Sequence, residues 1–276
     1  MMRGREIRRY TRVLAALLIP FLAVALVLLY LLPATTGQLF AWTIEPSLSA
    51  MMLGSAYAGG IVFFAHVARG GSWMRVRRGF PAVLTFATLA LVATLLHWDR
   101  FHFGHISFLT WVALYASTPA LVLAAMILQR TADSRGGYVI PRPVRRVLAG
   151  VGIAATVTGA VLFVVPQLLI DAWAWELTPL TARIVGAVLT LPGMVNVWML
   201  VDARWESFRV IFQAQLASLA LILLALVLAR DDLDWSRPAT PIIVGGLALS
   251  GIAYAAFYGL CERAAASVAN GQVSAE

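Results

Sequence analysis

Four side chains that bind metals or carry protons lie within about nine residues of each other: His97, Asp99, His102 and His105. Imidazole nitrogens and carboxylate oxygens are common ligands of zinc, iron and copper, and histidine also transfers protons near neutral pH. The cluster therefore predicts a metal site or a proton-transfer site. The alternative is an ordinary loop at the membrane surface, in which Asp99 pairs with Arg100. The spacing matches no established metal motif, so both interpretations stay open.

A second group of polar residues lies in stretches that are otherwise apolar. Tyr115, Asn196, Gln213 and Gln215 carry hydroxyl or amide groups, and Pro192 interrupts the stretch that contains Asn196. Polar groups and broken helices at membrane depth often mark binding sites. These four residues are therefore candidates to line a ligand cavity. Hydrogen bonds between helices and a kink at the proline are the simpler explanation.

Arg183 is a lone basic residue near the start of an apolar stretch, on the face of the membrane that we predict to be the outer one. Asp171 and Glu176 precede it by twelve and seven residues. A charge without a partner is costly at the edge of the hydrocarbon. We therefore predict that Arg183 pairs with one of these two carboxylates.

The composition places all these residues in a membrane. Hydrophobic residues make up 61% of the 276 residues and charged residues 12%, against about 45–50% and about 25% in soluble domains. This excludes a soluble enzyme and a nucleic-acid partner. All 21 basic residues are arginine, which excludes Schiff-base and other lysine-dependent chemistry. The single cysteine, Cys261, allows no internal disulfide, and the sequence requires no cofactor.

Eight stretches are long and apolar enough to cross a bilayer as helices, which takes roughly 17–25 residues. None contains the strict alternation of a transmembrane β-strand. The sequence therefore predicts an all-α bundle of eight transmembrane helices. The predicted spans are Val13–Leu32, Leu48–Val67, Phe80–Leu96, Phe108–Leu128, Val147–Val165, Ile184–Leu200, Phe212–Ala229 and Ile242–Leu260.

The arginines predict the orientation. With the N-terminus in the cytoplasm, 17 of the 21 arginines fall in segments on that side, as the positive-inside rule requires. We therefore predict a multi-pass protein of a bacterial plasma membrane with both termini in the cytoplasm. Its basic loops would lie against the anionic lipids of the inner leaflet. These segments are 1–12, 68–79, 129–146, 201–211 and 261–276.

The two halves of the chain match at an offset of 133 residues. Ala41-Trp42, followed by Pro46, corresponds to Ala174-Trp175, followed by Pro179. We predict an internal duplication of a four-helix unit, with repeats 1–133 and 134–276. An even number of spans gives both repeats the same orientation. The tryptophans of this element are expected to lie among the lipid headgroups.

Small residues recur at four-residue spacing in two of the predicted spans. Such faces let helix backbones approach closely, within one bundle or between chains. The second and eighth spans are therefore candidate faces for a homo-oligomer or a hetero-oligomer. The residues are Ala50, Gly54 and Ala58 in the second span, and Gly251, Ala255 and Gly259 in the eighth.

Four segments carry a resemblance that covers nearly the whole chain: Leu39–Trp42, Leu95–Phe101, Thr178–Arg183 and Asp234–Thr240. With them the chain resembles a group of uncharacterised multi-pass membrane proteins from high-GC, actinobacteria-like genomes. The absence of lysine is compatible with the codon bias of such genomes. The family has no assigned activity, so the resemblance implies a membrane protein and assigns no catalytic residue.

Three functions fit these observations. The first is a non-enzymatic membrane protein, either a structural or accessory subunit or a binder of lipid or of a hydrophobic small molecule. The second is a permease-like transporter, favoured by the duplication and by the prolines within spans. The third is a membrane enzyme or redox protein that uses the segment His97–His105. The uncharged spans and the lack of catalytic motifs favour the first.

Overall fold

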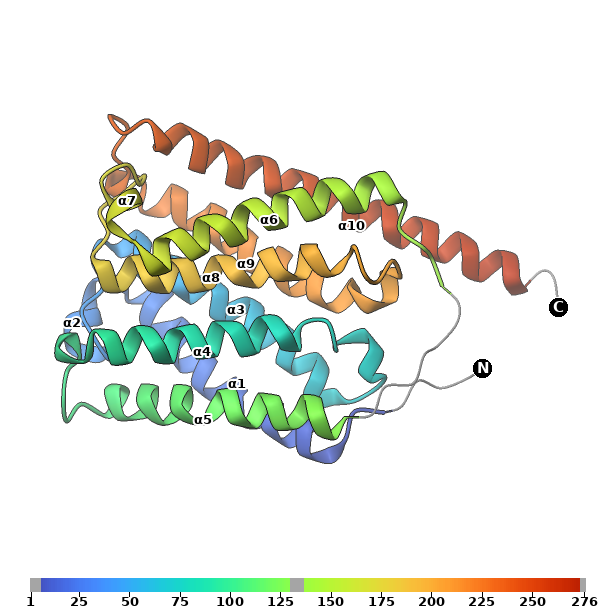
Figure 1. The fold of residues 1–276 in the computed structure, drawn as a ribbon, viewed down its shortest axis with the longest axis horizontal. Coiled ribbons are helices and arrows are strands. Elements are labelled where there is room, and N and C mark those ends of the chain that lie inside the picture. The colour runs from blue at the N-terminus through green and yellow to red at the C-terminus, as the bar shows by residue number, and fades with distance from the viewer. Residues whose placement is uncertain (1–5, 130–136, 274–276) are drawn as a thin grey trace.

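The computed structural model describes residues 6–129 and 137–273, and this part of the chain is a bundle of helices (Figure 1). The described residues form no named strand, and isolated bridges join Glu6 with Ser72 and Val139 with Arg204. The predicted all-α fold class is therefore confirmed. The predicted division between residues 133 and 134 lies outside the described residues, as do the arginines at positions 3, 5, 130 and 135.

Ten α-helices follow one another in the described residues, and short 3-10 turns stand in several of the connections. Eight of the helices are long and run along the bundle (Figure 1), while α2 and α7 are single turns. The helices are α1 (Arg9–Leu26, continued by a π-helical turn, Val27–Leu31), α2 (Thr36–Leu39), α3 (Ser47–Arg69), α4 (Phe80–Leu96), α5 (Ile106–Leu128), α6 (Arg142–Val164), α7 (Gln167–Ile170), α8 (Pro179–Trp198), α9 (Arg209–Leu228) and α10 (Ala239–Val273).

Seven of the described helices have the length and apolar composition needed to cross a membrane. They are α1 with its π-helical turn, α3, α5, α6, α8, α9 and α10, so the chain is a helical membrane protein. The remaining long helix, α4, is apolar but has 17 residues. At 1.5 Å per residue it is about 25 Å long, shorter than a typical hydrocarbon core. The count of eight spans therefore stays a prediction.

Several helices differ from the predicted spans at their ends, and two of these differences have identifiable reasons. Helix α8 begins at Pro179, because Thr178 caps it: the Thr178 hydroxyl oxygen accepts a hydrogen bond from the backbone N–H of Thr181 (3.2 Å). Helix α10 continues well beyond its predicted end at Leu260. Its Glu262 there accepts hydrogen bonds from Trp205, just before α9, and from Arg209 at the start of α9, which gives the extended helix contacts beyond the apolar stretch.

Helices α3, α4, α8 and α9 occupy the middle of the bundle. Contacts join α3 to α9, α4 to α8 and α3 to α8, while α1, α5, α6 and α10 pack on the outside against α3, α4, α8 and α9 respectively. In the most apolar stretch of each helix, 78% of the residues are buried in α3 and 61% in α8, but only 6% in α10. The core therefore lies between the second and third long helices of each half.

The start of α1 and the end of α10 lie at the same end of the bundle (Figure 1), which we call the terminal end. The connections α3–α4 and α8–α9 also lie there. The opposite end, called the far end, holds the connections after α1, α4, α6 and α9. This arrangement agrees with the predicted grouping of loops, although it does not say which side faces the cytoplasm.

Backbone hydrogen bonds of the first half recur in the second. At the terminal end the N–H of Ile7 donates to Gly71 and that of Ile140 to Ala203, each at 2.8 Å. At the far end the N–H of His102 donates to Ala41 and that of Asp234 to Ala174, each at 2.9 Å. The donors and acceptors before the α3–α4 connection correspond at the predicted offset of 133. Gly71 with Ala203 and His102 with Asp234 correspond at an offset of one residue less.

Close contacts between glycines hold α6 against α8. A Cβ atom at Gly159 would lie 2.6 Å from the carbonyl oxygen of Gly186, and one at Gly152 would lie 2.6 Å from that of Gly193. Side chains of any other residue would therefore separate these two helices. The glycines of this contact recur at seven-residue spacing, and they were not among the predicted small-residue faces.

The predicted small-residue faces have different surroundings. In the second predicted span, Ala50 is buried and a Cβ atom at Gly54 would lie 3.1 Å from Cβ of Tyr30. This face packs against the chain's own first long helix. In the eighth predicted span, Gly251 lies against Leu223, whereas a Cβ atom at Gly259 would meet no described atom within 4 Å.

Candidate ligand cavity

A cavity of about 310 Å³ lies between the central helices. Volumes from about 300 Å³ upward are typical of small-molecule sites. Its walls come mainly from α3, α4, α8 and α9, and none of the described residues that line it is charged. The lining extends to Val151 of α6, whose side chain is 45% exposed on the outside of the bundle. The cavity therefore reaches toward the lateral surface that lipid covers.

Two amide side chains in this lining have polar atoms without a partner. Both the nitrogen and the oxygen of the Gln215 amide are buried and make no hydrogen bond with the described residues. The Asn196 side chain, 1% exposed, donates to the Tyr254 hydroxyl and leaves its own oxygen unpartnered. Buried polar groups are nearly always hydrogen-bonded, because leaving one unpaired costs about 1–3 kcal/mol. A hydrogen-bonding occupant that reached these groups would remove this cost.

The other two residues predicted to line a cavity lie elsewhere. Tyr115 stands behind the wall, where its hydroxyl is 2.9 Å from the hydroxyl of Tyr57, which does line the cavity. Gln213 is absent from the lining, and its amide nitrogen donates to the Tyr258 hydroxyl at 2.7 Å. Two residues apart on α9, Gln213 and Gln215 point to different surroundings, as helical geometry requires.

The four residues of the histidine cluster each contact a different group. His97 Nε2 lies 2.7 Å from an Arg183 nitrogen, and His105 Nδ1 lies 2.6 Å from the Ser107 hydroxyl. His102 contacts the backbone oxygen of Phe40 through Nδ1 (3.0 Å). The described residues include no group of three His, Cys, Asp or Glu side chains that could hold a metal ion.

Asp99 forms an exposed ion pair with Arg100 at 3.3 Å, which is the local pairing that the loop interpretation expects. The imidazoles are directed toward separate backbone and side-chain partners. The structure therefore does not bring the cluster together around a common point.

Arg183 is bonded to His97, and within the described residues it forms no ion pair with either of the two predicted carboxylates. Asp171 and Glu176 line a separate, smaller hollow at the far end, together with Arg237. The Arg237 guanidinium donates to the carboxylate of Asp234 (2.8 Å) and to the backbone oxygens of Ile170 and Trp173. The carboxylates thus lie beside a different arginine from the one predicted.

The contact between Arg183 and His97 requires a neutral imidazole. A guanidinium has only donors, so His97 Nε2 must accept. Partial burial lowers the pKa of His97 below its ordinary 6.5, and the positive charge of Arg183 lowers it further, while Asp99 opposes the shift. The bond joins the end of α4 in one half to α8 in the other, and it weakens when His97 takes up a proton.

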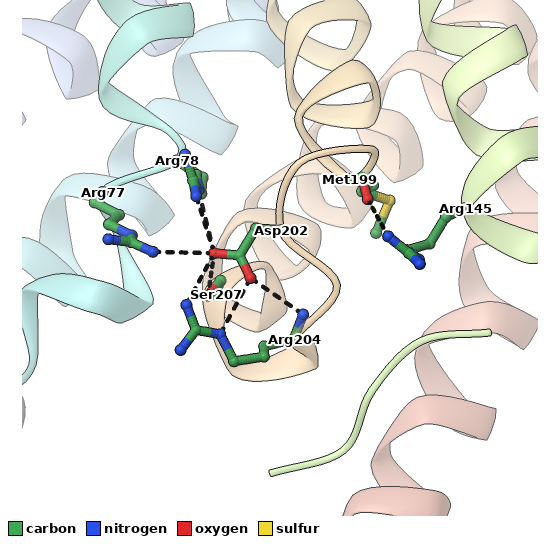
Figure 2. Close-up of polar contacts among 7 residues, drawn as sticks. All are labelled: Arg77, Arg78, Arg145, Met199, Asp202, Arg204 and Ser207. Atoms are coloured by element: carbon green, nitrogen blue, oxygen red, sulfur yellow. Dashed lines mark hydrogen bonds and ion pairs between the residues drawn. The ribbon is translucent and has the colours of Figure 1, made fainter. Parts of the chain in front are cut away.

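At the terminal end, one carboxylate holds three arginines (Figure 2). Asp202, whose side chain is 3% exposed, follows α8 and accepts hydrogen bonds from Arg77 and Arg78 of the other half. Arg204 and the Ser207 hydroxyl also donate to it. Burial alone would raise the pKa of Asp202, but hydrogen bonds from Arg204 and Arg77 hold it well below its ordinary value.

Asp202 is a structural centre that was not among the residues predicted from the sequence. The sequence does indicate an ion pair at this position, because Asp202 is one of few acidic residues among the arginine-rich segments predicted to face the cytoplasm. A neighbouring ion pair, Arg75 with Glu206 at 3.3 Å, joins the same two connections. Figure 2 also shows Arg145 donating to the carbonyl oxygen of Met199 (3.1 Å), which satisfies a carbonyl at the end of α8.

At the far end, the tryptophans of the repeated element are buried, which corrects the expectation that they lie among headgroups. Trp42 is 2% exposed and packs against Trp111, with ring centroids 4.7 Å apart. Trp175 is fully buried, and its indole N–H donates to the hydroxyl of Ser49 in the other half (2.9 Å). These indoles fill the far end of the bundle, where Trp42 packs against another aromatic ring and Trp175 donates to a side-chain hydroxyl.

The fold and this site define a class: a helical membrane protein with an uncharged cavity between its central helices. Comparison with protein-family models, with curated proteins and with solved structures found no match. The resemblance to the uncharacterised family therefore stays a prediction, and the function is argued from the chain's own residues.

Proposed function

We propose that this protein binds a hydrophobic molecule, a lipid or a lipid-like compound, in its central cavity. The observation that carries the proposal is the unpartnered Gln215 amide in an uncharged and mostly apolar wall. An empty apolar cavity with a buried, unsatisfied amide is unfavourable. An occupant with an apolar body and a polar group removes both costs.

The position of the cavity supports a ligand that is dissolved in the membrane. The wall includes residues of α1, α6 and α10, which form the outside of the bundle, such as Leu22, Val151 and Leu247. A molecule that moves within the bilayer meets these helices first. The absence of charge on the described lining fits the same kind of ligand, since a charged molecule would lose its hydration without a counter-charge.

A variant that fills the cavity tests this proposal. Ala56→Phe places a ring in the cavity wall. Ala256→Phe makes the same substitution on the exposed face of α10 and is the control. A fluorescent alkyl-chain tracer is titrated against each protein in lipid nanodiscs. We expect the wild type and Ala256→Phe to bind one tracer saturably and Ala56→Phe to lose at least tenfold in affinity. Equal binding by all three proteins contradicts the proposal.

A permease-like carrier is the second candidate, because the cavity lies between helices contributed by both halves. In several transporter folds the substrate site lies where two repeats meet. Uptake of the tracer into vesicles distinguishes the two functions. A binder equilibrates with the tracer without changing flux, whereas a carrier accelerates its movement across the bilayer.

We also propose that the two halves are copies of one four-helix unit. The recurring hydrogen bonds and the matching helix contacts support it. Contacts of α3 with α9 and of α8 with α4 exchange under a rotation of about 180° about an axis along the membrane normal, as expected for parallel repeats. An experimental structure in which residues 9–128 do not superimpose on 142–273 contradicts the duplication.

The orientation is proposed from the arginines: the terminal end faces the cytoplasm and the anionic lipids of a bacterial inner leaflet. A cysteine introduced at Gln38, exposed at the far end, tests it. We expect an impermeant thiol reagent to label Gln38→Cys from outside intact cells. Labelling only after permeabilisation reverses the orientation. Thr240 is a poor labelling site because it is fully buried.

A further inference from the structure

The unpartnered groups in the wall of the cavity define the kind of polar group that an occupant would carry. The Gln215 side chain carries an N–H donor and a C=O acceptor on the same carbon, and neither has a partner among the described residues. Asn196 adds an unpartnered oxygen to the same wall. A primary amide is matched by a second group with its own donor and acceptor side by side.

We propose that the cavity selects an uncharged amphiphile whose polar end is a carboxamide-type group, and that Gln215 recognises this end. This inference rests on the proposed function and specifies the ligand for the same site. A carboxamide forms two hydrogen bonds with Gln215, one in each direction. The apolar remainder of the wall accommodates the hydrocarbon part.

The lining also opposes charged headgroups. The described residues of the wall include no Arg, His, Asp or Glu that could neutralise a phosphate, a carboxylate or a quaternary ammonium. Moving such a charge out of water without a counter-charge is strongly unfavourable. The positively charged clusters of the molecule, such as that around Asp202, lie at the terminal end and outside the lining.

Four probes with the same C12 chain separate these requirements: dodecanamide, N,N-dimethyldodecanamide, dodecanoate and dodecyltrimethylammonium. Each competes with the alkyl-chain tracer for the wild-type protein in nanodiscs of neutral lipid. We expect dodecanamide to displace the tracer at concentrations about tenfold lower than the others, because two hydrogen bonds to an otherwise unpaired amide account for a factor of this size. The dimethylated probe lacks the donor and tests this point without any mutation.

Gln215→Leu removes the recognising groups, and Gln213→Leu is the matched control on the same helix, outside the lining. We expect Gln215→Leu to bind the tracer but to show less than threefold preference for dodecanamide over N,N-dimethyldodecanamide, while the two charged probes stay disfavoured by the uncharged lining. We expect Gln213→Leu to retain the preference. Equal displacement by all four probes in the wild type overturns the inference and leaves the proposed function standing. Failure of the wild type to bind the tracer overturns both.

Discussion

Two helix contacts join the halves of the chain, α3 with α9 and α4 with α8, and they are built differently. Where α3 crosses α9, a Cβ atom at Gly59 would lie 2.7 Å from the carbonyl oxygen of Ala214, and the Ser218 hydroxyl donates to the carbonyl of Ser55 (2.8 Å). This contact, called the tight seam, brings two backbones together. Where α4 crosses α8, called the wide seam, Phe86 and other large side chains stand in the wall of the cavity.

The polar contacts of the two seams also differ. The tight seam is joined at the far end, where the Asp232 carboxylate accepts from the N–H of Leu48 at the start of α3 (2.8 Å). The wide seam is joined at both ends, by Asp202 with its arginines and by the bond between His97 and Arg183. Close backbone packing therefore marks the tight seam, whereas polar side chains at both ends join the wide seam, and residues of both seams line the cavity.

The largest expected effect comes from removing the charge that joins the wide seam at the terminal end. Asp202→Asn leaves Arg77, Arg78 and Arg204 without this counter-charge, which we expect to cost about 3 kcal/mol in the free energy of unfolding. Thermal unfolding in detergent measures it. Asp99→Asn, which removes an exposed carboxylate, is the control and should change the midpoint little.

The wild type should also lose this contribution in acid. The pKa of Asp202 is lower in the folded protein than its ordinary 3.8, so the stabilisation is present above that pH and declines as the pH falls below it. An Asp202→Asn protein as stable as the wild type would show that the wide seam does not depend on this cluster.

The tight seam is tested by adding one methyl group. Gly59→Ala places a carbon against the backbone of α9, and we expect a loss of about 2 kcal/mol, because a carbonyl oxygen cannot move aside without shifting its helix. Gly245→Ala on α10 adds the same methyl group in open space and should be neutral or slightly stabilising. Equal unfolding midpoints for the two variants would contradict the close crossing.

A smaller effect is expected at the far end of the tight seam. Asp232→Ala removes the acceptor of the Leu48 N–H at the start of α3, and losing such a cap costs about 1 kcal/mol. Its neighbour Asp231 is the matched control, since its side chain is 97% exposed. If Asp231→Ala and Asp232→Ala lower the unfolding midpoint equally, Asp232 contributes only through its negative charge, and its hydrogen bond to the Leu48 N–H contributes nothing further.

The smallest expected effect is a pH dependence at the far end of the wide seam. Because the pKa of His97 is lowered in the folded protein, the unfolded chain binds more protons as the pH falls below about 6.5. The stabilising contribution of neutral His97 is therefore fully present above that pH and declines below it. His97→Gln keeps an acceptor for Arg183 and should flatten this part of the profile. An unchanged profile in His97→Gln assigns the dependence to another group.

The sequence predicted the features that depend on local composition. Continuous apolar stretches located the helices, and amide side chains within such stretches singled out Asn196 and Gln215, which the structure places in the cavity wall. Helix ends were less predictable where a tertiary contact extends them, as Glu262 does for α10.

Features that depend on pairing between distant segments could not be predicted in the same way. Asp202 is joined to residues more than 120 positions away, and nothing in its own loop specifies them. The histidines lie close together in the chain, but the direction of each ring depends on which backbone or side-chain group lies beside it. Trp42 and Trp175 have the residue type of a membrane interface, yet the packing of the far end buries them.

An experimental density map of the protein in lipid nanodiscs would show directly whether the space between the two seams holds a ligand. We expect density for a bound molecule between α3, α4, α8 and α9 that reaches the Gln215 amide. A closed, dry contact between these helices, with both Gln215 amide atoms bonded to the chain itself, would contradict the proposed binding function.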